Sequence, residues 1–147
     1  MKLANSIKIS LFIKPEEDYE SLTKAFFKLL PFNLEEEKLQ VKTSKATSFS
    51  QRQIIIHELE LNKDKHTNLF LRFLRDQLDD QQRKMLMMQE DRLDPNLDFF
   101  IRLDKESLLH DQYQITDCGE CYHIRISIAA FPRKREAALE VVRKIFS

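Results

Sequence analysis

Three consecutive cations, Arg133, Lys134 and Arg135, follow Pro132 where the apolar pattern of a last helix begins. The amino end of a helix carries partial positive charge, so each exposed cation there is unfavourable by about 0.3–1 kcal/mol. A bound anion would reverse that effect, because free backbone N–H groups, the helix dipole and the three side chains would all favour a phosphate. This basic cluster therefore indicates nucleic-acid binding, and a solvated surface helix is the alternative interpretation.

Further cations lie in two other segments. Lys42, Lys45 and Arg52 occur within a stretch, 38–57, that contains no acidic residue, and Arg102 and Lys105 lie at the end of a predicted strand. Acidic residues gather elsewhere, and the formal net charge of the 147 residues is +0. A neutral chain with segregated charge can still present one basic face. We expect these five side chains to extend a phosphate-contacting surface if they lie near the basic cluster.

Cys118 and Cys121 have the spacing of half a zinc site or of a redox pair. His110 and His123 are the nearest further ligands, but no second CxxC and no HxxxH completes a tetrahedral set. The pair also lies in a predicted hairpin, whereas a thioredoxin-like pair opens a helix. We therefore expect a turn with no metal and no cofactor. A disulfide across the turn is the alternative for a hyperthermophile source.

Catalytic patterns are absent from the sequence. The only glycine, Gly119, cannot build a glycine-rich phosphate loop. None of the four histidines accompanies a nucleophile in a recognisable elbow. Carboxylate pairs such as Asp79 and Asp80 suit the solvated side of a charged helix. We predict no catalytic residues and expect a protein that is not an enzyme.

The elements that position these residues follow from hydrophobic periodicity and from helix-start and helix-stop residues. Alternation predicts strands at 7–13, 39–43, 52–61, 99–103, 113–115 and 122–131. Helical spacing predicts helices at 18–30, at 69–92, which either continues through or kinks at Asp79-Asp80, and at 132–146, and a short helical turn at 104–109. Asp18 and Asp104 are predicted N-caps, and Pro132 is placed at the first position of the last helix. Residues 43–51 are predicted to form a hairpin loop, and Gly119 a tight turn.

Short hairpin-type connections dominate this order of elements, so the sheet should be mainly antiparallel. Helices packed on one face of that sheet give a two-layer α+β fold. The length predicts a single domain, 1–147. No stretch approaches the roughly 20 apolar residues of a membrane span. Two cysteines fit a reducing compartment, so we expect a cytoplasmic protein without a membrane partner.

Three segments resemble an archaeal family of predicted RNA-binding proteins that is associated, largely from genome context, with the RNA-degrading exosome. They are residues 99–106, with the run Arg-Leu-Asp-Lys, residues 133–139, with the basic cluster, and the opening strand and helix through Leu30-Pro31. The resemblance implies a fold akin to the ribosomal protein that binds 5S rRNA or to double-stranded RNA-binding domains. It also implies RNA and exosome subunits as partners, and no known catalytic activity. The family's glycine-containing loop has no counterpart in residues 43–51, where Ser44, Lys45 and Ser48 remain as phosphate contacts.

The leading hypothesis is a non-catalytic RNA-binding protein that contacts the phosphate backbone through the basic cluster. We expect binding mainly to phosphates and shape, without bases stacked on aromatic side chains of the central strands. One alternative is an interaction protein, a homodimer that uses a sheet edge or the Met-rich run at 85–88. Another is a metal-dependent enzyme at Cys118 and Cys121.

Overall fold

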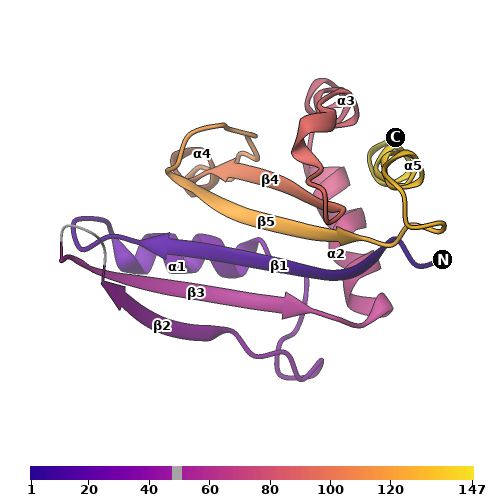
Figure 1. Cartoon of the computed structure of the whole chain (residues 1–147). Coiled ribbons are helices and arrows are strands. Elements are labelled where there is room, and N and C mark those ends of the chain that lie inside the picture. The colour runs from indigo at the N-terminus through magenta and orange to yellow at the C-terminus, as the bar shows by residue number, and fades with distance from the viewer. Residues whose placement is uncertain (48–50) are drawn as a thin grey trace. The chain divides into compact units, whose positions relative to one another are not determined.

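A computed structural model describes residues 1–47 and 51–147 of the protein (Figure 1). Five antiparallel strands form one open sheet in the order β2-β3-β1-β5-β4, accompanied by five α-helices. This architecture confirms the predicted α+β class. No helix among the described residues combines the length and the apolar character needed to cross a membrane.

The elements alternate along the chain much as the periodicity predicts. In order they are β1 (Ala4–Ile13), α1 (Tyr19–Lys28), β2 (Lys42–Thr47), β3 (Gln53–Leu61), α2 (Asp64–Gln77), α3 (Asp80–Met88), the 3₁₀ turn η1 (Glu90–Arg92), β4 (Asp98–Asp104), α4 (Lys105–Leu109), β5 (Cys121–Ile128) and α5 (Arg135–Phe146).

The chain divides into two compact units. Unit 1 comprises Met1–Ile7, Leu61–Ile101 and Ile124–Ser147, and unit 2 comprises Lys8–Glu60 and Arg102–His123. Both units draw on segments that are far apart in the sequence. The single domain expected from chain length stays a prediction.

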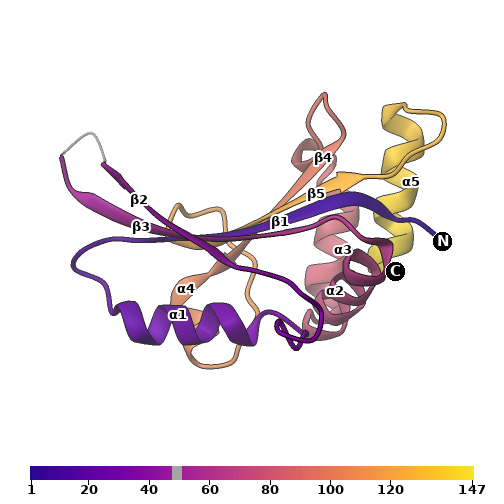
Figure 2. The ribbon, with the colours of Figure 1, turned by 90° about the horizontal axis from the view of Figure 1, so that it is seen from below.

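Unit 2 buries one side of its strands beneath α1 and α4, which lie on the same side of its part of the sheet (Figure 2). Ile9, Leu11 and Ile13 of β1 are at most 2% exposed, as their period of two requires. Asp18 caps α1 through the Ser21 amide at 3.3 Å, and the Asp104 carboxylate accepts from the Ser107 amide at 2.9 Å to cap α4. Both predicted N-caps are confirmed.

The core of unit 2 also holds a buried hydroxyl. Tyr122 of β5 is fully buried, and its ring stacks on Phe26 of α1 with centroids 6.5 Å apart. Its hydroxyl donates to the Leu22 carbonyl at 3.1 Å. Burial raises the pKa of Tyr122 above its ordinary value of 10.0, so this donor keeps its proton and holds β5 against α1.

Unit 1 packs α2, α3 and α5 with the remaining parts of the strands. Phe99 of β4 contacts Phe146 of α5, with ring centroids 6.2 Å apart, and both side chains are fully buried. Of the two alternatives for residues 69–92, a continuous helix or one kinked at Asp79-Asp80, the structure has the interruption: α2 ends at Gln77 and α3 begins at Asp80. Asp79 then caps α3 by accepting from the Gln82 amide at 2.8 Å.

The predicted hairpin between the second and third strands is wrong at its first strand. β2 begins at Lys42 and runs through Thr47, paired antiparallel with β3 from Lys42↔Glu58 to Thr47↔Gln53. Residues 43–47, predicted as loop, are therefore strand, and residues 48–50 lie outside the described part of the chain. All six side chains of β2 are exposed, so no hydrophobic alternation marks this edge strand in the sequence.

The strand predicted at 113–115 is also wrong. Only Ile115 pairs, in an isolated bridge to Leu103. Two backbone bonds, from Asp104 N to Gln114 O at 2.8 Å and from Thr116 N to Arg102 O at 2.9 Å, flank that bridge. The segment turns away on either side, so it forms no strand.

Gly119 does not need the conformational freedom of glycine. It lies in the bend before β5 without a positive φ, and a Cβ placed on it would meet nothing within 4 Å. Left-handed backbone occurs instead at Lys38, Gln51, Leu97 and Asp111, with φ between 56 and 65°. The tight turn predicted from the glycine has no special backbone geometry at that residue.

Candidate nucleic-acid interface

The last helix begins three residues later than predicted. α5 starts at Arg135, and Lys134 is its N-cap, with an extended backbone and no side-chain capping bond. The Lys134 amide donates to the Pro132 carbonyl at 2.8 Å, and this local turn takes the place of the helical turn predicted there. The first helical bond to the cap runs from Ala138 N to Lys134 O at 3.0 Å. Arg133 and Lys134 therefore precede the helix, and only Arg135 belongs to it.

The basic cluster is exposed, and its charges are not neutralised by described carboxylates. Arg133 donates to the Asn96 carbonyl at 3.4 Å, while Arg135 donates to the Leu93 and Glu90 carbonyls at 2.9 and 2.7 Å. Carbonyl oxygens orient a guanidinium group but do not cancel its charge. Within the described residues, none of the three cations forms an ion pair. The cluster thus retains positive charge beside backbone amides that no side chain caps.

The carboxyl group of Asp98 lies close enough to the basic cluster for Arg133 to affect its pKa. Burial raises the pKa of Asp98 above its ordinary value of 3.8, and the neighbouring Asp94 acts in the same direction. Arg125 and Arg133 act in the opposite direction, which places Arg133 within electrostatic reach of Asp98. The field of Arg133 is therefore weakened in part by an acid of the same unit.

Two lysines of unit 2 lie on β2, both exposed. The pairing register places Lys42 opposite Glu58 and Lys45 opposite Ile55. Positions three apart on a strand point to opposite faces, so the two lysines serve different sides of the sheet. Ser44 shares the face of Lys42, and the predicted contact Ser48 lies outside the described residues.

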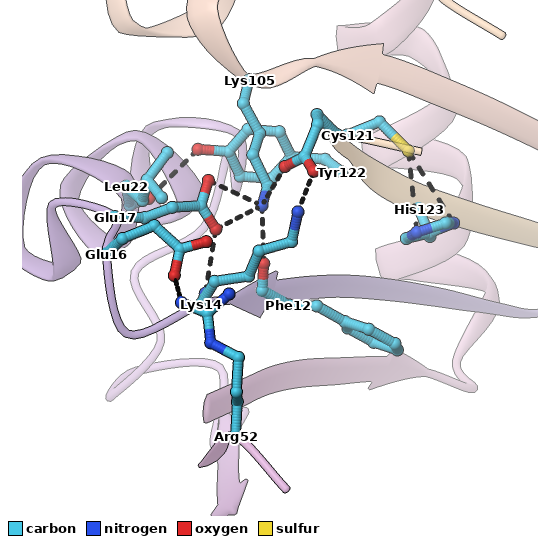
Figure 3. A network of polar contacts seen from close by, with 11 residues as sticks. Phe12, Lys14, Glu16, Glu17, Leu22, Arg52, Lys105, Cys121, Tyr122 and His123 are labelled. Carbon is cyan, nitrogen blue, oxygen red and sulfur yellow. Dashed lines mark hydrogen bonds and ion pairs between the residues drawn. The ribbon is translucent and has the colours of Figure 1, made fainter. Parts of the chain in front are cut away.

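Two predicted RNA contacts are engaged within the fold instead (Figure 3). The guanidinium group of Arg52 bonds to Glu16. Lys105 is 7% exposed, and its ammonium group donates to the Phe12 carbonyl at 2.7 Å and to Glu17 at 3.0 Å. A phosphate could reach Lys105 only by displacing these partners, which argues against Lys105 as an RNA contact. Arg52 is exposed and pairs with Glu16 at the surface, so it stays a predicted contact.

A second ion pair completes this network. Lys14 bonds to Glu120, and Glu120 also lies 3.6 Å from the ammonium nitrogen of Lys105. The bond from Lys14 holds the pKa of Glu120 below its ordinary value, and the same bond raises the pKa of Lys14. The network is a structural clamp between the ends of β1, α1, α4 and β5, and its charges largely compensate one another.

Arg102 differs from Lys105 although both belong to the same short motif. It lies on the exposed side of β4, and its guanidinium group donates to the Asp117 carbonyl at 3.2 Å. Arg102, Lys42 and Lys45 are exposed cations of unit 2. Lys42 and Lys45 lie on β2, at one edge of the sheet, and Arg102 lies on β4, at the other edge, while the basic cluster belongs to unit 1.

The sequence reasoning missed an aromatic pair on β1 and β5. Phe12 is 44% exposed, and its ring centroid lies 5.5 Å from that of His123, with planes tilted by 43°. The signal was present, because the alternation that buries Ile9, Leu11 and Ile13 places Phe12 on the other face of β1. The expectation that the central strands offer no stacking aromatic overlooked this residue.

The two cysteines of the CxxC pair lie in different surroundings. Both are free, Cys118 exposed and Cys121 buried, and Cys121 Sγ lies 3.6 Å from Nε2 of His123. Burial raises the pKa of the Cys121 thiol, which disfavours the reactive thiolate. The described residues contain no group of three or more His, Cys, Asp or Glu side chains able to hold a metal ion.

An open antiparallel sheet with exposed aromatic and basic side chains is a surface suited to a nucleic-acid strand. A family model described as RNA binding matches residues 6–129, so the chain belongs to this RNA-binding family. The matched range contains β2, Phe12, Arg102 and His123 but ends before the basic cluster.

Relatives span nearly the whole chain. The chain is 28% identical over 142 residues to the RNA-binding protein PAB1135 of Pyrococcus abyssi, covering 96% of this chain and 92% of that protein. The structure of this chain is similar to that of AF2318 from Archaeglobus fulgidus, with a TM-score of 0.84 and 25% identity. The match covers 97% of this chain and 99% of AF2318. Mth689, a DUF54 protein from Methanothermobacter thermautotrophicus, matches with a TM-score of 0.78 and 25% identity over 99% and 100% of the chains.

Proposed function

We propose that the protein is a non-catalytic RNA-binding protein that holds backbone phosphates at the start of α5. The observation that carries the phosphate site is the basic cluster at an uncapped helix start, without an ion-pair partner among the described residues. The RNA-binding role is supported by the family and by the relative PAB1135, which is named an RNA-binding protein. Lys42, Lys45 and Arg102 provide further phosphate contacts on unit 2.

The basic cluster is unfavourable for the helix when no ligand is bound. Cations at the positive end of a helix oppose its dipole, and at Lys134 a lysine stands where a capping side chain would satisfy an amide. A phosphate oxygen supplies the missing acceptor and the opposite charge together. Arg133 and Lys134 would bind it directly, whereas Arg135 is held by the carbonyls of Glu90 and Leu93.

The salt dependence of RNA affinity tests this site. Each phosphate contact contributes about −0.7 to the slope of log affinity against log salt for single strands. We expect the double variant Arg133→Gln, Lys134→Gln to reduce the magnitude of that slope by about 1.4. The measurement is fluorescence anisotropy with a labelled oligo(U) strand between low and physiological salt. The triple variant that includes Arg135→Gln should lower the slope further, with its folding checked because Arg135 also anchors η1.

A matched control exists on the same helix. Arg143 and Lys144 lie in the last turn of α5, are exposed, and can be replaced by Gln with the same loss of charge. This control variant should leave the slope near that of the unmodified protein. A slope that both double variants change equally would reduce the site to general charge, and a slope that neither changes would exclude it.

Association with the RNA-degrading exosome belongs to the same proposal and is supported by the resemblance carried by residues 99–106 and 133–139. The test mixes the protein with exosome purified from the same organism, with and without nuclease. Co-elution that survives nuclease treatment would support direct contact. Co-elution that nuclease abolishes would attribute the association to shared RNA.

A further inference from the structure

The side of unit 2 opposite α1 and α4 carries side chains of the outward register. Lys8, Ser10 and Phe12 alternate with the inward residues of β1, although Ser10 is itself buried. Lys8 pairs with Glu58 of β3 at 3.3 Å on that side. Lys42 is directly opposite Glu58 on β2, so it shares this face. Cys121 and His123 of β5 lie two residues apart and contact each other, as neighbours on one face do. Phe12 lies near the end of β1 and is exposed on this face.

Phe12 and His123 form an aromatic pair with fixed geometry (Figure 3). The Phe12 carbonyl accepts from the buried Lys105 ammonium, which holds the end of β1 in place. The His123 ring is half-buried and is contacted by Cys121 Sγ. Burial lowers the pKa of His123 below 6.5, and Arg102 and Lys105 lower it further, so the ring is neutral at neutral pH. Two uncharged rings are thus held side by side, one of them 44% exposed.

The charge around this pair favours an anionic partner. Arg102 is exposed and near enough to affect the titration of both Cys121 and His123. Lys105 contributes to the same field, but it is paired with Glu17 inside the fold. His123 contacts Phe12 and lies within electrostatic reach of Arg102, so this face combines a flat apolar surface with a phosphate ligand. An apolar protein partner would gain nothing from Arg102, whereas a nucleotide uses both groups.

We propose that Phe12 and His123 form a stacking platform for an unpaired base of single-stranded RNA, with Arg102 binding an adjacent phosphate. The proposal rests on the RNA-binding function and specifies the form of RNA that unit 2 accepts. In duplex RNA the bases are stacked on one another inside the helix, so their flat faces are not available to Phe12. The platform therefore gives a preference for single strands, and it tolerates different bases because every base has an aromatic face.

The chain contains no tryptophan, so Phe12→Trp introduces a single fluorophore at the platform. Phe27 is the matched control, because it lies in unit 2 on α1 and is 43% exposed. We expect oligo(U) to quench the fluorescence of the Phe12→Trp variant and to leave that of Phe27→Trp unchanged. Phe12→Leu should weaken oligo(U) binding roughly ten- to a hundredfold, the usual effect of removing a stacking aromatic. Phe27→Leu should bind like the unmodified protein.

Two further readouts separate stacking from charge. Phe12→Leu should leave the salt slope unchanged, because no phosphate contact is lost, whereas Arg102→Gln should lower its magnitude by about 0.7. Binding of an A·U duplex of the same length should be unaffected by Phe12→Leu. Far-UV circular dichroism confirms that each variant is folded.

The outcomes distinguish this proposal from the function on which it rests. If the unmodified protein binds neither oligo(U) nor duplex, the RNA-binding function fails. If it binds oligo(U) but Phe12→Leu binds equally well, or Phe12→Trp is not quenched, the platform is overturned and the RNA-binding function stands. If Phe12→Leu abolishes a dimer seen by light scattering and leaves RNA affinity intact, the face accepts a second copy of the chain, and the platform is likewise overturned.

Discussion

Three positions of the run Arg102 to Lys105 have three different roles. Arg102 lies on the exposed side of β4, Asp104 caps α4, and Lys105 enters the interior to meet Glu17. In the sequence Arg102 and Lys105 are both cations near the end of a strand, and both suit an RNA contact. The strand period places Arg102 outward. The inward direction of Lys105 depends on the start of α4 at that residue and on the carboxylate of Glu17, which lies in the turn before α1. Residue type therefore predicted the positive charge of both side chains, but it did not predict which of them is exposed to a ligand.

At the residue scale we predict that Lys105→Met destabilises the protein by about 2–4 kcal/mol, because it leaves Glu17 as a largely buried charge without its partner. The measurement is urea unfolding at neutral pH. Lys28→Met is the control, since Lys28 pairs with Asp111 at 3.3 Å in an exposed setting where ion pairs contribute little. RNA affinity should be the same for both variants. A stable Lys105→Met protein that had lost RNA affinity would return Lys105 to the interface.

At the scale of elements, the starts of the helices divide into two kinds. α1, α3 and α4 follow an aspartate whose carboxylate accepts an amide of the first turn. α2 and α5 follow Lys63 and Lys134, with no side-chain cap. The caps at Asp18 and Asp104 were predictable because a short acceptor precedes a helical pattern. The start of α5 was not, since a proline at 132 suits a first helical position as well as it suits the turn that it forms here.

The uncapped start of α5 gives a prediction in which stability and binding change in opposite directions. Lys134→Asp supplies the missing acceptor and removes a cation from the positive end of the helix, so we expect about 1 kcal/mol of added stability. The same change should weaken binding to oligo(U), because it replaces a phosphate ligand with a like charge. Urea unfolding and anisotropy provide the two measurements.

Lys63→Asp makes the identical change at the uncapped start of α2. This control should gain comparable stability and keep the RNA affinity of the unmodified protein. Equal loss of affinity in both variants would mean that only net charge matters. Unchanged affinity in Lys134→Asp would remove Lys134 from the phosphate site.

At the scale of the whole molecule, local patterns established the elements but not their neighbours. The alternation of Ile9, Leu11 and Ile13 specifies β1 and, with it, the outward position of Phe12. Placing His123 beside Phe12 requires the strand order, in which β5 lies next to β1, and no local pattern encodes that order. The bounds of β2 were predicted wrongly for a related reason. A strand that is specified only by its pairing with β3 shows no hydrophobic alternation of its own.

Global stability should decrease on acidification, because two histidines of unit 2, one buried and one half-buried, bind a proton less readily in the folded chain than in the unfolded chain. Burial lowers the pKa of His57 and of His123 below the ordinary 6.5. The unfolded chain binds more protons than the folded one below that value, so stability is complete above pH 6.5 and is lost as pH falls through the lowered pKa values. His57→Gln should flatten this dependence, measured by urea midpoints between pH 5 and 8.

His110→Gln is the control for that series, because His110 is exposed at the end of α4, where its Nε2 lies 3.4 Å from the Glu106 carboxylate. Glu120 adds a separate phase at lower pH. Its pKa is held below the ordinary 4.5 chiefly by the bond from Lys14, so its contribution is present above that value and lost as pH falls further. A midpoint that does not change between pH 7 and 5 would contradict the assignment to the histidines.

The exposed margin formed by β2 has one more consequence. A strand at the edge of a sheet offers unpaired amides and carbonyls to any other strand, which is a common route to fibres and insoluble material. Lys42 and Lys45 project from opposite faces of that strand. A second chain that added itself there would bring like charges together on both faces and strip water from them. These lysines therefore oppose edge-to-edge aggregation of the protein. This effect does not depend on nucleic acid, and it would keep the protein dispersed in concentrated solution.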